Sequence, residues 1–303
     1  MNDKKSVYNW LYRAFIGLVL GFANVIPGVS GGTMMVVFGV YERIIGLINE
    51  FFKRIKTEWR YFLPIGVGMV AAIIIFGTLM DSLISSHEAV MAMFFVGVIL
   101  FSIPGIFKKA ALSKKRVLKT EIACVLAFVL MFGVMVLMDS SDANKEKEEI
   151  KAQSEQTELV EGEEAAEDEY TPDHSAGHLL MLVVYGAVAC ATMIIPGISG
   201  SLVMVMLGQY AAIMAAIHHM DILFLLPFAI GCLLGLIVCA KAIKWLLKHY
   251  ERVTYSAILG FVAGSLLPVF PDWTTAFSAG GIIAFVLGGA CIVACELLAP
   301  KEA

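Results

Sequence analysis

Hydrophobic residues fill long stretches of the chain, and one of the first is interrupted by a polar, glycine-rich break. This break runs from Pro27 to Thr33 with the sequence Pro-Gly-Val-Ser-Gly-Gly-Thr, between apolar arms at 14–26 and 34–48. About 20 helical residues are needed to cross the ~30 Å core of a bilayer, so we predict that neither arm spans a membrane alone. A Pro-Gly break leaves backbone groups unpaired, so it should be buried in protein or line a wet cavity.

The same kind of break returns 169 positions later, where Pro196 to Ser201 reads Pro-Gly-Ile-Ser-Gly-Ser between apolar arms. Two breaks in matching places indicate a binding site built by discontinuous helices. Unbroken apolar stretches follow each break, and we predict that they are transmembrane spans: 61–80, 89–107, 122–138, 223–240, 253–270 and 277–299.

Further residues align the two halves of the chain. Gly39 and Tyr41 recur as Gly208 and Tyr210 at an offset of 169, and other pairs recur at an offset of 163: Leu63/Leu226, Gly68/Gly231, Gly97/Gly260 and Ser102/Ser265. The sequence therefore predicts an all-α polytopic membrane protein made of two repeats. Each repeat would contain one Pro/Gly-broken, re-entrant helical hairpin and three transmembrane helices.

Charge predicts the organisation and the topology. Residues 139–173 hold 14 of the 26 acidic residues and only three lysines, so we predict an acidic, disordered linker at 139–176 between repeats at 1–138 and 177–303. With both termini in the cytoplasm and the linker outside, the basic loops at 53–60, 108–119 and 241–252 all face the cytoplasm. Three spans per repeat is an odd number, so the second repeat would be inverted.

Composition excludes several classes of protein. A chain that is 59% hydrophobic and 16% charged is typical of a polytopic membrane protein and not of a soluble domain or a nucleic-acid-binding protein. All six cysteines lie inside apolar segments without zinc-type spacing, and the sequence has no Walker-type phosphate loop. We therefore expect no metal site, no cofactor and no ATP-driven step within this chain.

Each break ends where a new helix is predicted to start. Serine and threonine hydroxyls can cap such a start, glycines allow close approach of a ligand, and the first backbone N–H groups favour anions, especially phosphate. The predicted phosphate-binding residues are Ser30, Gly31, Gly32, Thr33, Ser199, Gly200 and Ser201. The simpler alternative is that the small residues are kinks or helix-packing points.

Other polar residues near the first break have two interpretations. Asn24, Glu42 and Arg43 are candidates for gating or ion coupling, while Glu42 and Arg43 could instead anchor the chain at the membrane interface, where we also expect Arg13. Gly28 to Gly32 also fits the Gly-x-Ser-x-Gly pattern of serine hydrolases. Such an enzyme needs a base beside the serine, and no histidine lies inside an apolar segment, so we expect no catalytic residues.

The residues from Ala23 to Glu42, with Pro196 to Tyr210, resemble the paired signatures of a bacterial membrane family formerly described as a domain of unknown function. That family is associated with translocation of polyprenyl phosphate, in particular undecaprenyl phosphate. The resemblance covers nearly the whole chain except the acidic linker. The second copy departs from the first at Gln209 and Ala211, where the first has Val40 and Glu42.

The resemblance implies a flippase in the bacterial cytoplasmic membrane that returns the lipid carrier of cell-wall synthesis from the outer to the inner leaflet. H⁺ or Na⁺ are candidate coupling ions, and the sequence does not decide the lipid chain length or the oligomeric state. Two rivals remain open at this point. One is an ion-coupled secondary transporter of a small water-soluble anion, and the other is an intramembrane serine hydrolase.

Overall fold

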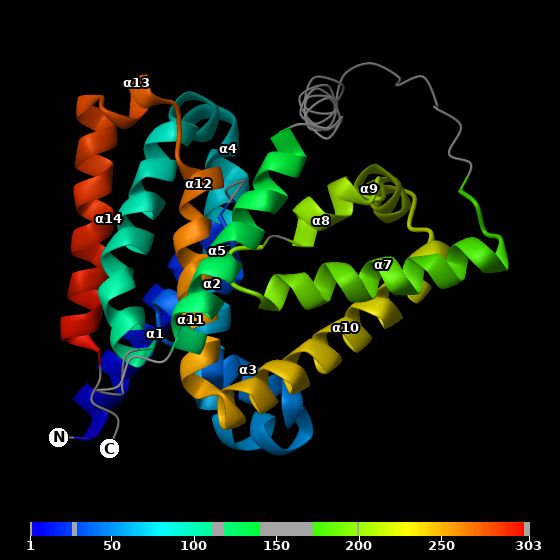
Figure 1. The fold of residues 1–303 in the computed structure, drawn as a ribbon, viewed down its shortest axis with the longest axis horizontal. Helices are drawn as coiled ribbons and strands as arrows, with labels where there is room; N and C mark the ends of the chain where they lie inside the picture. The colour runs from blue at the N-terminus through cyan, green and yellow to red at the C-terminus, as the bar shows by residue number, and fades with distance from the viewer. Residues whose placement is uncertain (1, 26–28, 111–117, 140–171, 199, 300–303) are drawn as a thin grey trace. The chain divides into compact units, whose positions relative to one another are not determined.

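The computed structural model describes residues 2–25, 29–110, 118–139, 172–198 and 200–299, and all the regular secondary structure in these ranges is helical (Figure 1). The helices are α1 (Asn2–Val25), α2 (Gly31–Val37), α3 (Tyr41–Asn49), α4 (Phe51–Ala110), α5 (Leu118–Asp139), α7 (Ala176–Ile194), α8 (Gly200–Met206), α9 (Tyr210–His218), α10 (Ile222–His249), α11 (Glu251–Gly264), α12 (Leu266–Val269), α13 (Trp273–Ala276) and α14 (Ala279–Leu298). Most of the predicted linker, 140–171, lies outside the described residues.

Six of the described helical segments are long and apolar enough to cross a membrane, so the chain is a multi-pass membrane protein. They are Phe51–Ile75, Ala89–Ala110, Ala176–Ile194, Ile222–His249, Glu251–Val269 and Ala279–Leu298. Several sequence-based expectations were wrong. Ala176–Ile194, which we expected to be an arm of the second break, is among these segments, whereas the predicted span at 122–138 corresponds to a shorter apolar helix, Thr120–Gly133. The backbone of α4 is helical through 81–88, where we expected a loop, and α1 extends the first arm back to Asn2, well beyond the apolar residues.

The contacts of the chain divide it into two compact units. Unit 1 comprises Met1–Met131, Ile195–Gly197 and Ala240–Ala303, and unit 2 comprises Phe132–Ile194 and Ile198–Cys239. Unit 1 therefore contains helices from both halves of the sequence. The repeat boundaries at 1–138, 139–176 and 177–303 remain a prediction.

In unit 1, glycines bring α1 and the first part of α4 into backbone contact. A Cβ atom on Gly17 would lie 2.0 Å from the Ile65 carbonyl oxygen, and one on Gly68 would lie 2.0 Å from the Ala14 carbonyl oxygen. Both distances are far inside van der Waals contact, so only glycine fits at these two positions. Close approach through small residues is the usual way in which membrane helices pack, because the lipid supplies little hydrophobic driving force between them.

In unit 2, the same contact joins α7 to α10. A Cβ atom on Gly186 would lie 2.2 Å from the Phe228 carbonyl oxygen, and one on Gly231 would lie 2.1 Å from the Val183 carbonyl oxygen. Every one of these residues follows its unit 1 counterpart at an offset of 169 or 163. The sequence alignment of the two halves therefore has a counterpart in helix packing.

The segment after each break bends a second time, which the sequence analysis did not anticipate. Gly39 and Gly208 have φ angles of 69° and 63°, a left-handed conformation that favours glycine. In the first copy the bend turns α3 by 115° from α2. The expected single arm at 34–48 is therefore two short helices, because the left-handed glycine stops the first one.

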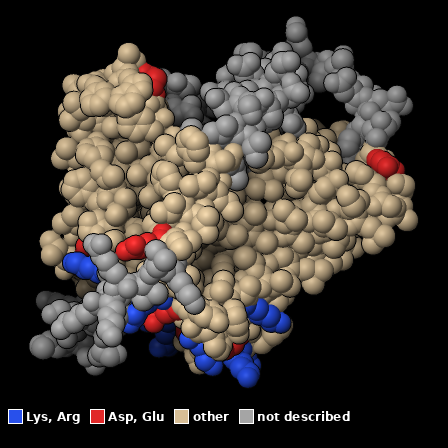
Figure 2. All heavy atoms as spheres, viewed as in Figure 1, with Lys and Arg blue, Asp and Glu red and all other residues tan. Residues whose placement is uncertain are grey.

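Unit 1 has one strongly charged end. Figure 2 shows its Lys and Arg side chains gathered where Figure 1 places α3. At this end Glu50 bonds to Lys244 and lies 3.1 Å from Arg54, and the Asn49 amide donates to the Ala240 carbonyl at 2.9 Å. The Tyr8 hydroxyl donates to the Leu298 carbonyl at 2.5 Å, so the start of α1 and the end of α14 lie together.

The Glu50 contacts predict a small effect of pH on stability. Hydrogen bonds from Lys244 and Arg54 hold the pKa of the Glu50 carboxyl below its usual 4.5. Because that pKa is lowered by folding, the stabilisation is complete above pH 4.5 and is lost as the pH falls through the folded-state pKa. We expect Glu50→Gln to lower the melting temperature slightly at pH 7 and low salt, and not at pH 3 or in high salt. An equal loss at both pH values would show that the charge is not responsible.

Candidate functional site

The first break leads directly into α2, and its hydroxyl groups are buried. Ser30 and Thr33 are 4% and 0% exposed. Ser30 occupies the N-cap position without a capping side-chain hydrogen bond, so the expectation that it caps the helix was wrong. The Thr33 hydroxyl instead accepts a hydrogen bond of 2.7 Å from the backbone N–H of Gly197. This bond joins the two breaks across 164 positions, inside unit 1.

Asn24 lies over the start of α2. Its Oδ1 atom is so close to Gly31 that a Cβ atom there would be 2.4 Å away, while its Nδ2 atom donates to the Leu20 carbonyl at 2.9 Å. In unit 2 Met193 covers Gly200 in the same way, with its Cγ atom 2.4 Å from the position of a Cβ atom. Equivalent residues thus cover the two helix starts, with a polar side chain in the first copy and an apolar one in the second.

The remaining predicted residues of the second break are only partly visible. Ser199 lies outside the described residues, and the Ser201 side chain is also outside them, although its backbone lies in the first turn of α8. Gly32 is buried in the first turn of α2. The structure therefore brings Thr33 and Gly197 together. A phosphate site shared by the serines of both breaks remains a prediction.

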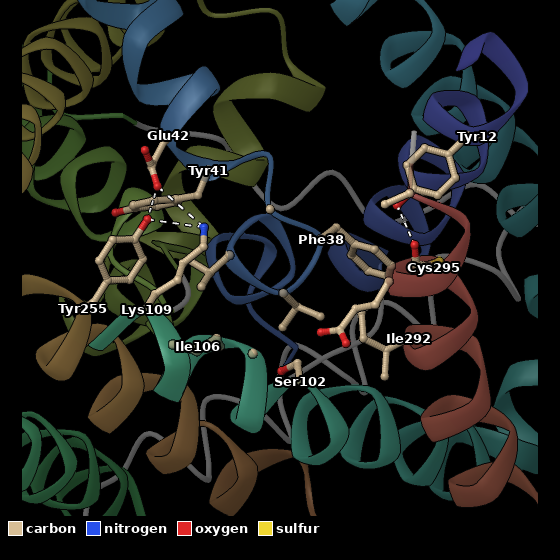
Figure 3. Close-up of a pocket in the computed structure, with 16 residues that line it drawn as sticks. Tyr12, Phe38, Tyr41, Glu42, Ser102, Ile106, Lys109, Tyr255, Ile292 and Cys295 are labelled. Atoms are coloured by element: carbon tan, nitrogen blue, oxygen red, sulfur yellow. Dashed lines mark hydrogen bonds and ion pairs between the residues drawn. The ribbon is translucent and has the colours of Figure 1, made fainter. Parts of the chain in front are cut away.

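A cavity of about 220 Å³ lies in unit 1 at the far end of α2 (Figure 3). It is lined from α1, α2, α3, α4, α11 and α14, and its polar lining residues are Tyr12, Tyr41, Glu42, Ser102, Lys109, Tyr255, Cys295 and Glu296. A seven-residue helix rises about 10 Å, so the cavity and the first break are one short helix apart.

Glu42 is paired inside this cavity. Its carboxylate accepts a hydrogen bond from the Tyr255 hydroxyl and lies 3.6 Å from Lys109 Nζ, which is 3.5 Å from the same hydroxyl. Figure 3 shows these three groups on one side of the cavity, with Tyr12 on the other side. Since Glu42 and Glu296 outnumber the single lysine in the lining, the cavity is better suited to a proton or a cation than to a phosphate.

Arg43 packs on an aromatic ring. Its Cζ atom lies 4.1 Å from the centre of the Tyr61 ring, and the Cζ atom of Arg13 lies 4.3 Å from the same ring. The structure thus brings Arg13 and Arg43 to the same ring, which the sequence did not indicate. The cluster comes from α1, α3 and α4, and both arginines are half-buried.

Comparison with known proteins identifies the family. The model of the VCA0040-like, undecaprenyl phosphate translocase-like family matches residues 20–281. The chain belongs to this family. It is 25% identical over 277 residues to a polyprenyl-phosphate transporter of Vibrio cholerae, which covers 87% of this chain and 78% of that protein. It is 29% identical over 279 residues to a polyprenyl-phosphate transporter of Staphylococcus aureus, covering 88% of each. No solved structure matches the chain.

Membership of the undecaprenyl phosphate translocase-like family confirms the resemblance drawn from the paired signatures. The transporter names of the relatives favour transport over hydrolysis. Sequence reasoning missed Lys109 and Tyr255 beside Glu42, and Tyr61 beside the arginines. Tyr255 and Tyr61 had no signal, because aromatic residues near span ends are common. Lys109 had one, because it is one of the two lysines that directly follow a predicted span.

Proposed function

We propose that the protein moves polyprenyl phosphate, in particular undecaprenyl phosphate, from the outer to the inner leaflet of a bacterial cytoplasmic membrane, and so recycles the carrier lipid. The phosphate would bind near the midplane at the two breaks, with Ser30 to Thr33 on one side and Ser199 to Ser201 on the other. The tail would remain in lipid. The names of the relatives support the substrate class.

The observation that carries this proposal is the bond between Thr33 and Gly197. It brings one residue of each break together in a buried position, although 164 residues separate them. Helix starts present backbone N–H groups without intrahelical partners, and these favour phosphate. Buried hydroxyls at the same place would complete an anion site without a charged side chain in the bilayer, where such a charge is costly.

Helix directions within unit 1 support an inverted repeat. Lys109, at the end of α4, contacts Tyr255, near the start of α11, and these two helices pack against each other, which indicates that the second span of α4 and α11 run antiparallel. These helices are counterparts at the offset of 163. Counterpart helices of opposite direction are what an inverted duplication requires, and re-entrant hairpins would then enter from the two faces. We place both termini and the basic end in the cytoplasm, following the positive-inside rule.

Glu42 is our candidate for coupling transport to an ion gradient. Its carboxylate, the Tyr255 hydroxyl and Lys109 line a cavity that begins one helix away from the break. A proton or Na⁺ bound there would change the charge balance at the far end of α2, the helix into which the break leads. Asn24, which covers Gly31, would contact the headgroup.

Reconstitution tests the proposal. We would follow transbilayer movement of labelled polyprenyl phosphate in liposomes, under imposed H⁺ or Na⁺ gradients, with wild type and Ser30→Ala/Ser199→Ala. A hydrogen bond to a charged group contributes about 1.5–3 kcal/mol, so the double variant should be roughly tenfold slower or worse. Ser265→Ala is the control, because this buried hydroxyl, just after α11, donates to the Val262 carbonyl three residues earlier, at 2.8 Å, and its loss should leave transport unchanged.

Two results would contradict this proposal in different ways. Full activity of the double variant would move the phosphate site away from the serines while keeping the substrate. Folded wild-type protein that moves no polyprenyl phosphate under any gradient, and instead transports a small anion such as inorganic phosphate, would favour the rival secondary transporter.

A further inference from the structure

The cluster of Arg13, Arg43 and Tyr61, which we call the arginine cluster, has no role in the transport proposal above. It holds two guanidinium groups against one ring, at 4.3 and 4.1 Å from its centre. Each cation–aromatic contact is favourable by about 0.5–2 kcal/mol, but two like charges close together repel one another. Two arginines on one ring therefore concentrate positive charge at this point of unit 1.

The second half of the chain provides an internal control. At the established offsets, Arg13, Arg43 and Tyr61 correspond to Leu182, Ala212 and Phe224. Those three residues form part of one apolar cluster in unit 2, where Leu182 is 0% and Phe224 2% exposed. The same packing position is therefore filled without charge in the other copy, so the fold itself does not require the arginines.

A hollow adjoins the arginine cluster. It has a volume of about 450 Å³ and is lined by Asn9, Trp10, Arg13, Trp59, Arg60 and Leu63. The Arg60 Cζ atom lies 5.4 Å from the Trp59 ring. These lining residues include two arginines and no carboxylate. The hollow is therefore cationic, in contrast to the cavity at Glu42.

We propose that the arginine cluster and this hollow bind the phosphate headgroup of a lipid at the membrane interface. Guanidinium groups form planar, bidentate hydrogen bonds to phosphate and still stack on aromatic rings, which suits Arg13, Arg43 and Arg60. Trp10 and Trp59 are 41% and 46% exposed, as tryptophans at a headgroup layer are, and the exposed Leu63 continues along α4 toward the acyl chains.

Two lipids share this chemistry. One is the polyprenyl phosphate itself, for which the hollow would be a second binding site, at the membrane interface and separate from the breaks. The other is an anionic phospholipid that remains bound. The inference concerns binding and does not depend on transport, so its failure and a failure of the transport proposal are distinguishable.

Tryptophan quenching tests the proposal directly. The chain has four tryptophans, and Trp245→Phe/Trp273→Phe leaves only Trp10 and Trp59, both in the hollow. This protein would be placed in phosphatidylcholine vesicles that contain equal fractions of brominated-chain phosphatidylglycerol or brominated-chain phosphatidylcholine. We expect severalfold stronger quenching by the brominated phosphatidylglycerol. Equal quenching by both lipids would overturn the proposal.

Two sets of variants separate a phosphate site from general positive charge. Arg13→Lys/Arg43→Lys keeps the charge and the membrane topology but loses the planar fork, so the preference for phosphatidylglycerol should largely disappear; Arg252→Lys is the control and should keep it. Arg13→Leu/Arg43→Ala/Tyr61→Phe installs the residues of the second half, and should fold while losing the preference. If the lysine variant retains the preference of the wild type, the proposal is wrong.

A competition experiment identifies which of the two lipids binds in the hollow. Unlabelled polyprenyl phosphate is added to the vesicles that contain brominated phosphatidylglycerol. Relief of quenching at low mole fraction assigns the hollow to the substrate. Persistent quenching assigns it to a resident anionic phospholipid, and either result supports a lipid-phosphate site.

Discussion

Replacing Gly17 with alanine is expected to destabilise the protein by about 3 kcal/mol, with a fall in melting temperature of about 5–10 °C in detergent. The added Cβ atom would lie 2.0 Å from the carbonyl oxygen of Ile65. Because that oxygen belongs to helix backbone, it cannot turn aside as a flexible side chain could, so α1 and α4 must separate. Gly186→Ala makes the equivalent contact with Phe228 at 2.2 Å and should cost a similar amount.

Gly66→Ala is the matched control for this prediction. It lies on α4 next to Ile65, and a Cβ atom there would meet no atom within 4 Å. Alanine has a higher helix propensity than glycine by about 1 kcal/mol, so this variant should be neutral or slightly more stable. If Gly17→Ala and Gly66→Ala have the same melting temperature, the close helix contact is not what holds α1 to α4.

Much of the fold was predictable because membrane spans depend on one simple property, the length of an apolar run. The predicted spans at 89–107 and 277–299 correspond closely to the observed Ala89–Ala110 and Ala279–Leu298. The expectations about helix boundaries that were wrong have local causes. The helix through 81–88 contains polar residues that are compatible with helix, and the bend at Gly39 follows from a positive φ angle that composition does not reveal.

The candidate site was predictable only in part, for a physical reason. A duplicated Pro-Gly break is a local pattern, so it is visible in the sequence, and the structure joins Thr33 of one copy to Gly197 of the other. The partners of Glu42 and Arg43 come from distant helices. Nothing in the sequence near Tyr255 or Tyr61 indicates which side chain will lie beside it, because that depends on helix rotation.

The two halves differ where function would need them to differ. Their packing glycines and left-handed bends agree, whereas the positions of Asn24, Glu42 and the arginine cluster are apolar in the second copy. A fully symmetric transporter would treat both leaflets alike. Polar groups confined to one copy are therefore the natural source of a difference between the two membrane faces.

Replacing Gly197 with alanine should have the second large effect, on both stability and transport. Gly197 has a φ angle of +89°, and a Cβ atom on it would lie 2.7 Å from the carbonyl oxygen of Phe261. The left-handed conformation alone costs a residue with a Cβ atom about 1–2 kcal/mol, and the contact with α11 adds to this. The break must then shift, and with it the N–H group that bonds to Thr33.

Gly208→Ala separates the two contributions to this effect. Gly208 has a φ angle of +63°, but a Cβ atom there meets nothing within 4 Å, so only the conformational cost of about 1–2 kcal/mol applies. We expect Gly208→Ala to fold and to transport polyprenyl phosphate in liposomes, and Gly197→Ala to lose at least twice as much stability and most of its transport. Equal effects of the two variants would mean that the position of Gly197 against α11 and Thr33 does not matter. A Gly197→Ala protein that is destabilised but still transports at the wild-type rate would instead place the phosphate away from the breaks.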